Sequence, residues 1–154
     1  MIYLNMQVVY IGADHRGFED KEKTKDYLKE EGYEVRDVGA FEYDQKDDYP
    51  DFAIKLGEAV VREKVRGILF CRSGVGVCVA ANKVRGIRAA LVATERQIIK
   101  AREDDDVNVL CLAADMVNID EDKKIIDAFL KTQFSPEERF IRRINKIKEY
   151  ENRT

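Results

Sequence analysis

The chain has 154 residues, a length that is usual for one domain and sufficient to bury a core without disulfides or metal. Hydrophobic residues make up 45% of it, which excludes wholesale disorder, and no apolar run approaches the roughly 18 residues that span a bilayer. The 27 basic and 30 acidic residues nearly balance, so there is no basic field for nucleic acid. We therefore expect one domain over residues 1–154 that acts on a small solute, without a membrane or nucleic acid partner.

The sequence indicates neither a targeting segment nor a disulfide framework. Residues Met1–Met6 contain no basic patch followed by a long apolar stretch and a cleavage site, so we expect no secretory signal and a cytoplasmic location. The three cysteines, Cys71, Cys78 and Cys111, form no C-x-x-C pair, and the chain has a single histidine, His15. We therefore expect no structural disulfide, no metal site and no cofactor.

Five apolar runs of strand length alternate with longer stretches of helical spacing. They are Gln7–Ala13, Tyr33–Val38, Gly67–Cys71, Ile87–Val92 and Val107–Leu112. This alternation predicts a parallel sheet, and three of the runs are apolar at nearly every position, as expected when helices cover both faces. The predicted fold is α/β: a three-layer α/β/α sandwich with a five-stranded parallel sheet, Rossmann-like, plus a C-terminal helix.

Three segments between and after these runs have clear helical signals. In Phe18–Glu31 the charged run Glu19–Lys23 predicts that the first turns are solvated. A helix beginning near Pro50 carries an apolar stripe that packs on the sheet. At the C-terminus, Ser135–Glu138 has the pattern of an N-cap, a first-turn proline and a capping box, so a helix is expected over about 136–150. This last helix could complete its own core or pack on a partner subunit, and the sequence leaves both open.

The first chemically interesting segment follows the first strand, where Asp14, His15 and Arg16 occupy a turn. Ligands of doubly wound sheets bind beyond the carboxyl ends of the strands, which makes this turn a candidate site. The alternative is that Asp14 only caps the next helix and that His15 is a surface residue. The turn alone favours that alternative.

The second segment, Cys71–Val77, is a cysteine at the end of a buried strand, followed by a glycine-spaced loop and a helix predicted over Cys78–Lys83. A thiol close to a helix N-terminus can ionise and act as a base or nucleophile, and the glycines allow backbone N–H groups to converge on an oxyanion. The alternative for Cys71 is a small buried hydrophobe, which is also what we expect of Cys78 and Cys111.

Three rival motifs are excluded on the same loop. A cysteine phosphatase needs an arginine where Val77 stands, and a dinucleotide fingerprint needs a glycine where Val79 stands. The Gly-Lys-Ser/Thr of a P-loop is absent.

Taken together, several segments closely resemble the ribose-5-phosphate isomerase B / galactose-6-phosphate isomerase family, in the order and spacing of that family. The segments are Asp14–Phe18, Asp48–Ala53, Gly67–Gly76, Ala80–Lys83 and Gly86–Ala90. The match runs from near Met6 to about Lys131. It implies aldose–ketose isomerisation through an enediolate, without metal or cofactor, in a homodimer or a dimer of dimers whose active sites are shared between subunits.

The resemblance also assigns roles around the cysteine. Cys71 matches the base that moves a proton between C1 and C2, because the family's alternative base, a glutamate, is absent at Val77. Ser73 matches a residue beside the enediolate, and the backbone of Gly74 to Gly76 matches the oxyanion donors.

The remaining matched residues are implied to contact the sugar or its phosphate. Asp14 matches a contact to sugar hydroxyls, His15 a contact to phosphate or an aid to ring opening, and Tyr49 a contact beside the ring. Arg72 and Asn82 lie within matched segments and are expected to be further substrate contacts.

The chain departs from the family pattern at three places. Asp104, followed by Asp105, stands where the family usually has a ring-opening histidine, and Asp115 stands where a phosphate-binding arginine is expected. The C-terminal Gly-Gly-Arg-His signature is missing, so that only Arg139 and Arg143 could replace it. Asp104 or Asp105 could assist ring opening if neighbouring carboxylates raised its pKa, and the alternative is a solvated acidic helix end.

These features support three hypotheses. The first is an isomerase of ribose 5-phosphate. The second is an isomerase of another aldose or aldose phosphate, similar to the galactose-6-phosphate enzymes. The third is a non-catalytic sugar-binding protein, and the presence of Cys71, Ser73 and the glycine loop favours catalysis over binding alone.

Overall fold

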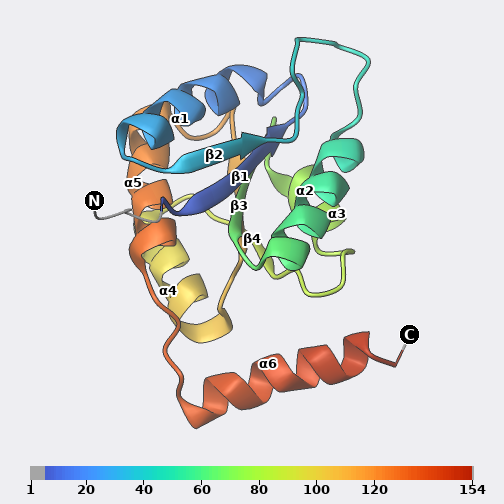
Figure 1. The fold of residues 1–154 in the computed structure, drawn as a ribbon, viewed down its shortest axis with the longest axis vertical. Helices are drawn as coiled ribbons and strands as arrows, with labels where there is room; N and C mark the ends of the chain where they lie inside the picture. Colours follow the sequence, from blue (N-terminus) through green and yellow to red (C-terminus); the bar gives the residue numbers. More distant parts are fainter. Residues whose placement is uncertain (1–5, 154) are drawn as a thin grey trace.

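The computed structural model describes residues 6–153 and contains one five-stranded sheet within that range, with all strands parallel (Figure 1). The strands are β1 Val8–Ala13, β2 Glu34–Asp37, β3 Arg66–Cys71, β4 Ala89–Leu91 and β5 Val109–Ala113. The helices are α1 Phe18–Glu30, α2 Tyr49–Glu63, α3 Val75–Ala81, α4 Glu95–Asp105, α5 Ile119–Lys131 and α6 Glu138–Glu151.

The sheet separates two hydrophobic cores, which confirms the three-layer prediction. On one face, α1, α4 and α5 pack around buried side chains such as Phe70 and Phe129. On the other face, α2 and α3 pack around Leu56 and Leu69. Strands covered on both faces are apolar at successive positions, which is the pattern that the sequence shows. Within residues 6–153, no helix is both long and apolar enough to cross a bilayer.

The strand order is β2-β1-β3-β5-β4, so the chain changes direction across the sheet between β1 and β3. These two strands pair in parallel, with Ala13 opposite Phe70. Their next residues, Asp14 and Cys71, therefore emerge at the same edge, at the switch point where doubly wound sheets bind ligands.

The prediction that the first turns of α1 are solvated is wrong at Lys21, which is fully buried. Its ammonium group contacts the carboxylate of Asp37, with Nζ 2.6 Å from Oδ2, and the ammonium group of Lys25 lies 2.7 Å from the same oxygen. The acid at the end of β2 compensates the buried charge, and periodicity within α1 contains no information about that partner.

Two helix starts also differ from the sequence prediction. Helix α3 begins at Val75, before Cys78, because Gly74 adopts the left-handed conformation that lets the chain turn directly into the helix. Helix α6 begins at Glu138 with Glu137 as its N-cap, so the proposed cap at Ser135 is wrong. The backbone N–H of Ser135 instead donates to the carbonyl of Glu103, which holds the preceding segment against α4.

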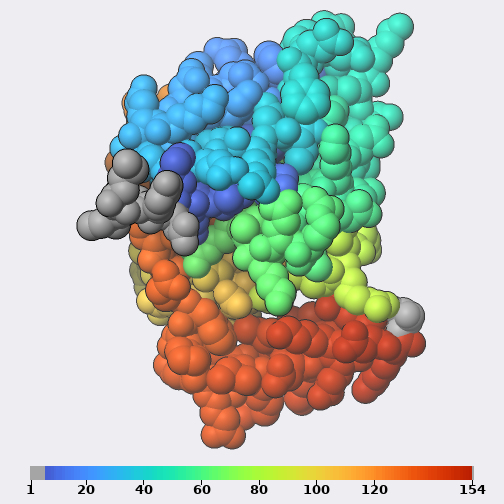
Figure 2. All heavy atoms as spheres, viewed as in Figure 1, coloured from blue at the N-terminus to red at the C-terminus, as the bar shows by residue number. Residues whose placement is uncertain are grey.

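Helix α6 crosses one end of the molecule, opposite the loop 38–48 (Figures 1 and 2). It buries Phe140 and Ile144, while Ile141, Ile147 and Tyr150 on the same helix are exposed. Apolar residues therefore lie on both the buried and the exposed sides of α6.

Candidate active site

Asp14 closes the turn between β1 and α1. Its carboxylate is buried, and Oδ1 accepts hydrogen bonds from the backbone N–H groups of Arg16 at 3.0 Å and Gly17 at 3.1 Å. Burial raises the pKa of Asp14, and the two backbone donors partly counteract it. The N-cap of α1 is Gly17 and has no side-chain cap, so Asp14 closes the turn before the helix and does not cap the helix itself.

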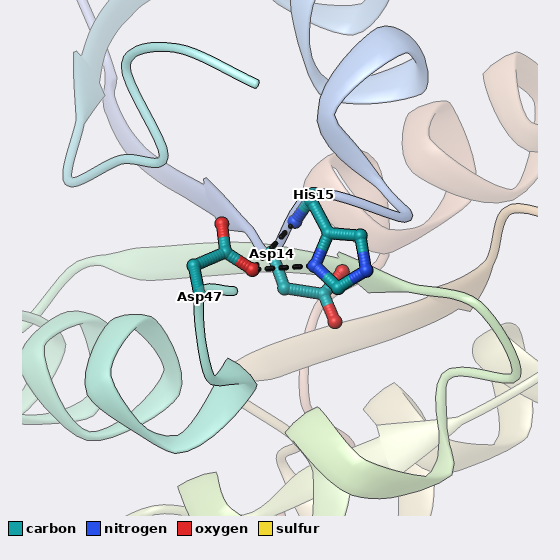
Figure 3. A group of neighbouring side chains, drawn as sticks. All are labelled: Asp14, His15 and Asp47. Carbon is teal, nitrogen blue, oxygen red and sulfur yellow. Dashed lines mark hydrogen bonds and ion pairs between the residues drawn. The ribbon is translucent and has the colours of Figure 1, made fainter. Parts of the chain in front are cut away.

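The neighbouring His15 is held by Asp47, from the loop between β2 and α2 (Figure 3). Asp47 Oδ1 lies 2.6 Å from His15 Nδ1 and accepts the backbone N–H of His15 at 3.0 Å. The ring of Tyr43 meets the imidazole edge-on, with the centroids 6.0 Å apart. Asp47 is the main residue that the sequence analysis missed. It lies 32 residues from His15, and no motif or period links the two.

The Cys71 loop brings the predicted oxyanion donors next to Tyr49. Cys71 is buried, and the hydroxyl of Ser73 accepts the backbone N–H of Val75 at 3.4 Å. A side chain at Gly76 would meet the ring of Tyr49, since an added Cβ would lie 2.8 Å from Cζ. Tyr49, the first residue of α2, therefore packs directly on the glycine loop, and its contact with a ligand stays a prediction.

The other two cysteines differ from each other. Cys111 is fully buried, and its pKa is well above the usual range because of that burial, as expected of a small hydrophobe. Cys78 is half-buried, and a hydrogen bond with Cys111 lowers its pKa to about 7. Cys78 packs against the core but is only partly buried, so the expectation of a small buried hydrophobe is met in part.

A hollow of about 480 Å³ opens beside the turn between β1 and α1. It is lined by His15, Arg16, Phe18, Glu19, Glu22, Tyr43 and Asp115. Asp115 forms an ion pair with Arg72, whose Nε lies 3.0 Å from Oδ2. Arg72, the residue after Cys71, is thus paired with Asp115. The family resemblance leads us to expect an arginine at position 115.

Asn82 does not join this group in the structure. It lies at the far end of α3, where its side chain forms two hydrogen bonds with the backbone of Ala89, at 2.8 and 3.0 Å. The observed role of the side chain is to hold the start of β4.

The predicted acidic residues at the end of α4 and the predicted arginines of α6 lie at the other end of the molecule. Asp104, Arg139 and Arg143 line a hollow of about 420 Å³ between the end of α4 and the start of α6. The carbonyl of Asp105 accepts Arg88 Nε at 2.8 Å, beside the start of β4. The structure of one chain therefore does not bring these residues together with Cys71.

The two groups differ in the chemistry they offer. The group at the switch point contains a buried thiol, an imidazole with a carboxylate partner, and glycine-loop N–H groups, which together suit proton transfer and oxyanion stabilisation. Asp14, His15 and Asp47 also place three potential metal-ligand atoms within 4.8 Å of one another. However, Asp14 Oδ1 and Asp47 Oδ1 are already engaged by hydrogen bonds, as described above.

Comparison with known proteins gives consistent results. The family described as Ribose/Galactose Isomerase matches residues 9–147. The probable ribose-5-phosphate isomerase B of Mycoplasma genitalium is 45% identical, over 95% of this chain and 97% of its own length. The ribose-5-phosphate isomerase B of Mycobacterium tuberculosis is 40% identical, over 93% of this chain and 89% of its own.

Solved structures agree with these sequence relatives. The crystal structure of ribose-5-phosphate isomerase B from Mycoplasma genitalium with bound ribulose-5-phosphate aligns with a TM-score of 0.92 and 43% identity, and the alignment covers 97% of this chain and 100% of that one. The isomerase B of Clostridium thermocellum gives a TM-score of 0.91 at 40% identity, covering 96% and 99% of the two chains.

Proposed function

Because this chain belongs to the ribose/galactose isomerase family, we propose that it interconverts an aldose and a ketose, with ribose 5-phosphate and ribulose 5-phosphate as the substrate pair. The observation that carries the proposal is the buried Cys71 thiol at the switch point, beside the glycine loop, in a chain 43% identical to a structure with bound ribulose-5-phosphate. No cofactor is needed, because the reaction moves protons within one molecule and leaves its overall oxidation state unchanged.

In the proposed mechanism the thiolate of Cys71 removes the C2 proton of the open-chain aldose. The electron pair forms the C1–C2 double bond, and the aldehyde oxygen takes up negative charge as an enediolate. Backbone N–H groups of Gly74 to Gly76 stabilise that charge. The proton then returns to C1, while the proton of the C2 hydroxyl moves to the C1 oxygen with Ser73 as the relay.

Substrate orientation is assigned to residues of the same edge. Asp14 binds sugar hydroxyls, and Tyr49 lies beside the sugar, because its ring packs on the glycine loop that faces the reacting carbons. His15 contacts the substrate through the nitrogen that Asp47 does not engage. Arg72, the residue after Cys71, would help to bind an anionic group if its pairing with Asp115 is released.

We further propose that two copies of the chain build each complete site, as a homodimer or a dimer of dimers. Asp104, Asp105, Arg139 and Arg143 would then face the Cys71 edge of the partner. Their distance from Cys71 within one chain supports this arrangement, as do exposed apolar residues at the two regions that would meet. These residues are Val75, Val79 and Leu91 near the glycine loop and Ile141, Ile147 and Tyr150 on α6.

Mixing two inactive variants tests the shared site. Cys71→Ser damages one half, and the double variant Arg139→Ala with Arg143→Ala damages the other. Unfolded and refolded together, random dimers should recover about a quarter of wild-type activity, because half of the dimers are mixed and each has one intact site. If mixing restores nothing while both variants fold, each chain does not draw its second half from a partner.

A second candidate function is isomerisation of a different aldose or aldose phosphate. The observation that favours it is the Arg72–Asp115 pair, because it engages the arginine next to Cys71 with an acid that would repel a phosphate. A panel of free and phosphorylated aldoses, assayed for ketose formation, distinguishes the candidates by their kcat/KM. Absence of turnover with every sugar, together with measurable sugar binding, would instead identify a non-catalytic binding protein.

The cytoplasmic location expected from the sequence stays a prediction.

A further inference from the structure

We infer that Asp47 is a positioning residue for His15 and that the pair opens the sugar ring before isomerisation. The inference rests on the proposed function, because ring opening matters only if a cyclic aldose is the substrate. It gives a role to Asp47, a residue that the sequence analysis did not single out and that lies in a different loop from His15.

The contact between the two side chains fixes the imidazole. One oxygen, Oδ1 of Asp47, accepts both the backbone N–H of His15 at 3.0 Å and the ring nitrogen Nδ1 at 2.6 Å. The two contacts prevent the ring from turning independently of its backbone. Tyr43 meets the ring at an interplanar angle of 84° and limits the remaining rotation.

The same contact selects a tautomer. An ionised carboxylate only accepts hydrogen bonds, so the proton between the two side chains belongs to Nδ1 of His15. The other ring nitrogen, Nε2, then has a free electron pair. In Figure 3 it points away from Asp47, and His15 lines the hollow of about 480 Å³ beside the turn.

The Asp47 side chain is held in one position by burial as well as by its contact with His15. Only 10% of its side chain is exposed, against 18% for His15. Its second oxygen, Oδ2, is buried and has no hydrogen-bond partner among residues 6–153. A buried carboxylate with one oxygen unpaired destabilises a fold, so the geometry of this loop favours the contact with His15 over full satisfaction of the acid.

Ring opening is a pair of proton transfers that a histidine with a carboxylate partner can catalyse. Nε2 of His15 takes the proton of the anomeric hydroxyl, C1 becomes an aldehyde, and the bond from C1 to the ring oxygen breaks with its electrons on that oxygen. The imidazolium then returns the proton to the ring oxygen, so that no net charge or proton is lost. During this step the Asp47 carboxylate stabilises the imidazolium. His15 is the only histidine in the chain, so no other imidazole can carry out this proton transfer.

The test uses the difference between the two substrates. Ribose 5-phosphate is mostly a furanose, whereas ribulose 5-phosphate cannot close a furanose ring because its O5 carries the phosphate. Asp47→Asn keeps the shape of the side chain and removes its charge. We expect it to slow conversion of ribose 5-phosphate about 100-fold, within the range of acid–base catalysis, and to leave the loss of the C1 proton of ribulose 5-phosphate in D₂O within about twofold of wild type.

A second readout comes from enzyme concentration. If the variant can use only aldehyde that forms spontaneously, its forward rate should stop rising as enzyme is added, while the wild-type rate continues to rise. Glu42→Gln is the matched control, because it removes one exposed acid from the same loop and should leave both directions unchanged. Thermal unfolding of each variant checks that the fold is retained.

Several results would overturn the inference. An equal fall in both directions would make Asp47 a structural residue, and no fall in either would remove it from the reaction. Loss of wild-type activity on treatment with EDTA, restored by a divalent cation, would instead identify Asp14, His15 and Asp47 as a metal site. A wild type that converts neither sugar and exchanges no C1 proton would refute the proposed function itself, which is a distinct result.

Discussion

Arg72 donates from Nε to Oδ2 of Asp115 over 3.0 Å, and the backbone N–H of Asp115 donates to the carbonyl of Arg72 at 3.1 Å. The ends of β3 and β5 are thus joined by a side-chain and a main-chain contact. The pair brings an acid to the edge where a phosphorylated sugar would place its dianion.

Asp115→Asn should therefore lower KM for ribose 5-phosphate and leave kcat nearly unchanged. Both partners are largely exposed, and exposed charge contacts are worth about 0.2–1 kcal/mol, so we expect a change of at most about fivefold. The effect should shrink at high salt, because exposed charges are screened. Glu30→Gln, at the end of α1, is a control of equal charge. An unchanged KM at low salt would mean that the phosphate binds away from Asp115.

Cys71→Ser should reduce kcat by about 10²–10⁴-fold, because an alcohol ionises too weakly at neutral pH to replace a thiolate as the base. The fold should be retained, since the substitution changes one atom of a buried side chain. Cys111→Ala removes another buried thiol from the adjacent strand and should keep most of the activity. Steady-state assays and thermal unfolding separate the two effects, and a fully active Cys71→Ser variant would exclude the cysteine from the mechanism.

Cys78 should react with iodoacetamide in a strongly pH-dependent way. Its pKa is lowered to about 7, chiefly by the hydrogen bond with Cys111, and only the thiolate is nucleophilic. The rate of alkylation should therefore rise about tenfold per pH unit below pH 7 and level off above it. Mass spectrometry of the modified peptide measures the rate at this residue. In Cys111→Ala the plateau should move to higher pH, and a rate that keeps rising to pH 9 in the wild type would contradict the assignment.

The layers and the sheet could be predicted from sequence because burial on both faces leaves an apolar run in each of β1, β3 and β5. The positions of Cys71 and the glycine loop at a strand end followed from the same reasoning. Contacts between distant segments could not be predicted. In the sequence Lys21 belongs to a charged run that looks solvated, and only the fold shows that Asp37 lies beside it. Asp47 likewise has no periodic relation to His15.

The candidate site was predicted to be shared between subunits, and within one chain its residues lie in two separate groups. Helix α4 runs back from the carboxyl edge of the sheet, so Asp104 lies at the edge opposite Cys71. Motif order shows which residues a family uses, but it does not show which chain supplies them. The topology within one chain separates the two groups, and the mixing experiment tests whether a partner brings them together.

Asp122, in the first turns of α5, provides a prediction about stability. Its side chain is fully buried, and neither of its oxygens has a hydrogen-bond partner among the described residues. Burial, followed by the nearby charge of Asp20, raises its pKa from the ordinary 3.8 to about 7. Between these two values the folded protein holds a proton that the unfolded chain has released, so this group's contribution to stability falls as pH rises from about 4 to 7.

Asp122→Asn removes the titration while keeping the size of the side chain. Near pH 4 the variant should unfold at nearly the same temperature as the wild type. At pH 8 it should unfold several degrees higher, because folding of the wild type then requires Asp122 either to be buried as a charge or to take up a proton. The full pKa change corresponds to at most about 4 kcal/mol, and each kcal/mol moves Tm by about 2–4 °C in a chain of this size. Asp120→Asn changes an exposed acid on the same helix and should produce no such growth with pH. A difference between wild type and Asp122→Asn that stays constant from pH 4 to 8 would show that the carboxyl group titrates alike in the folded and unfolded chains.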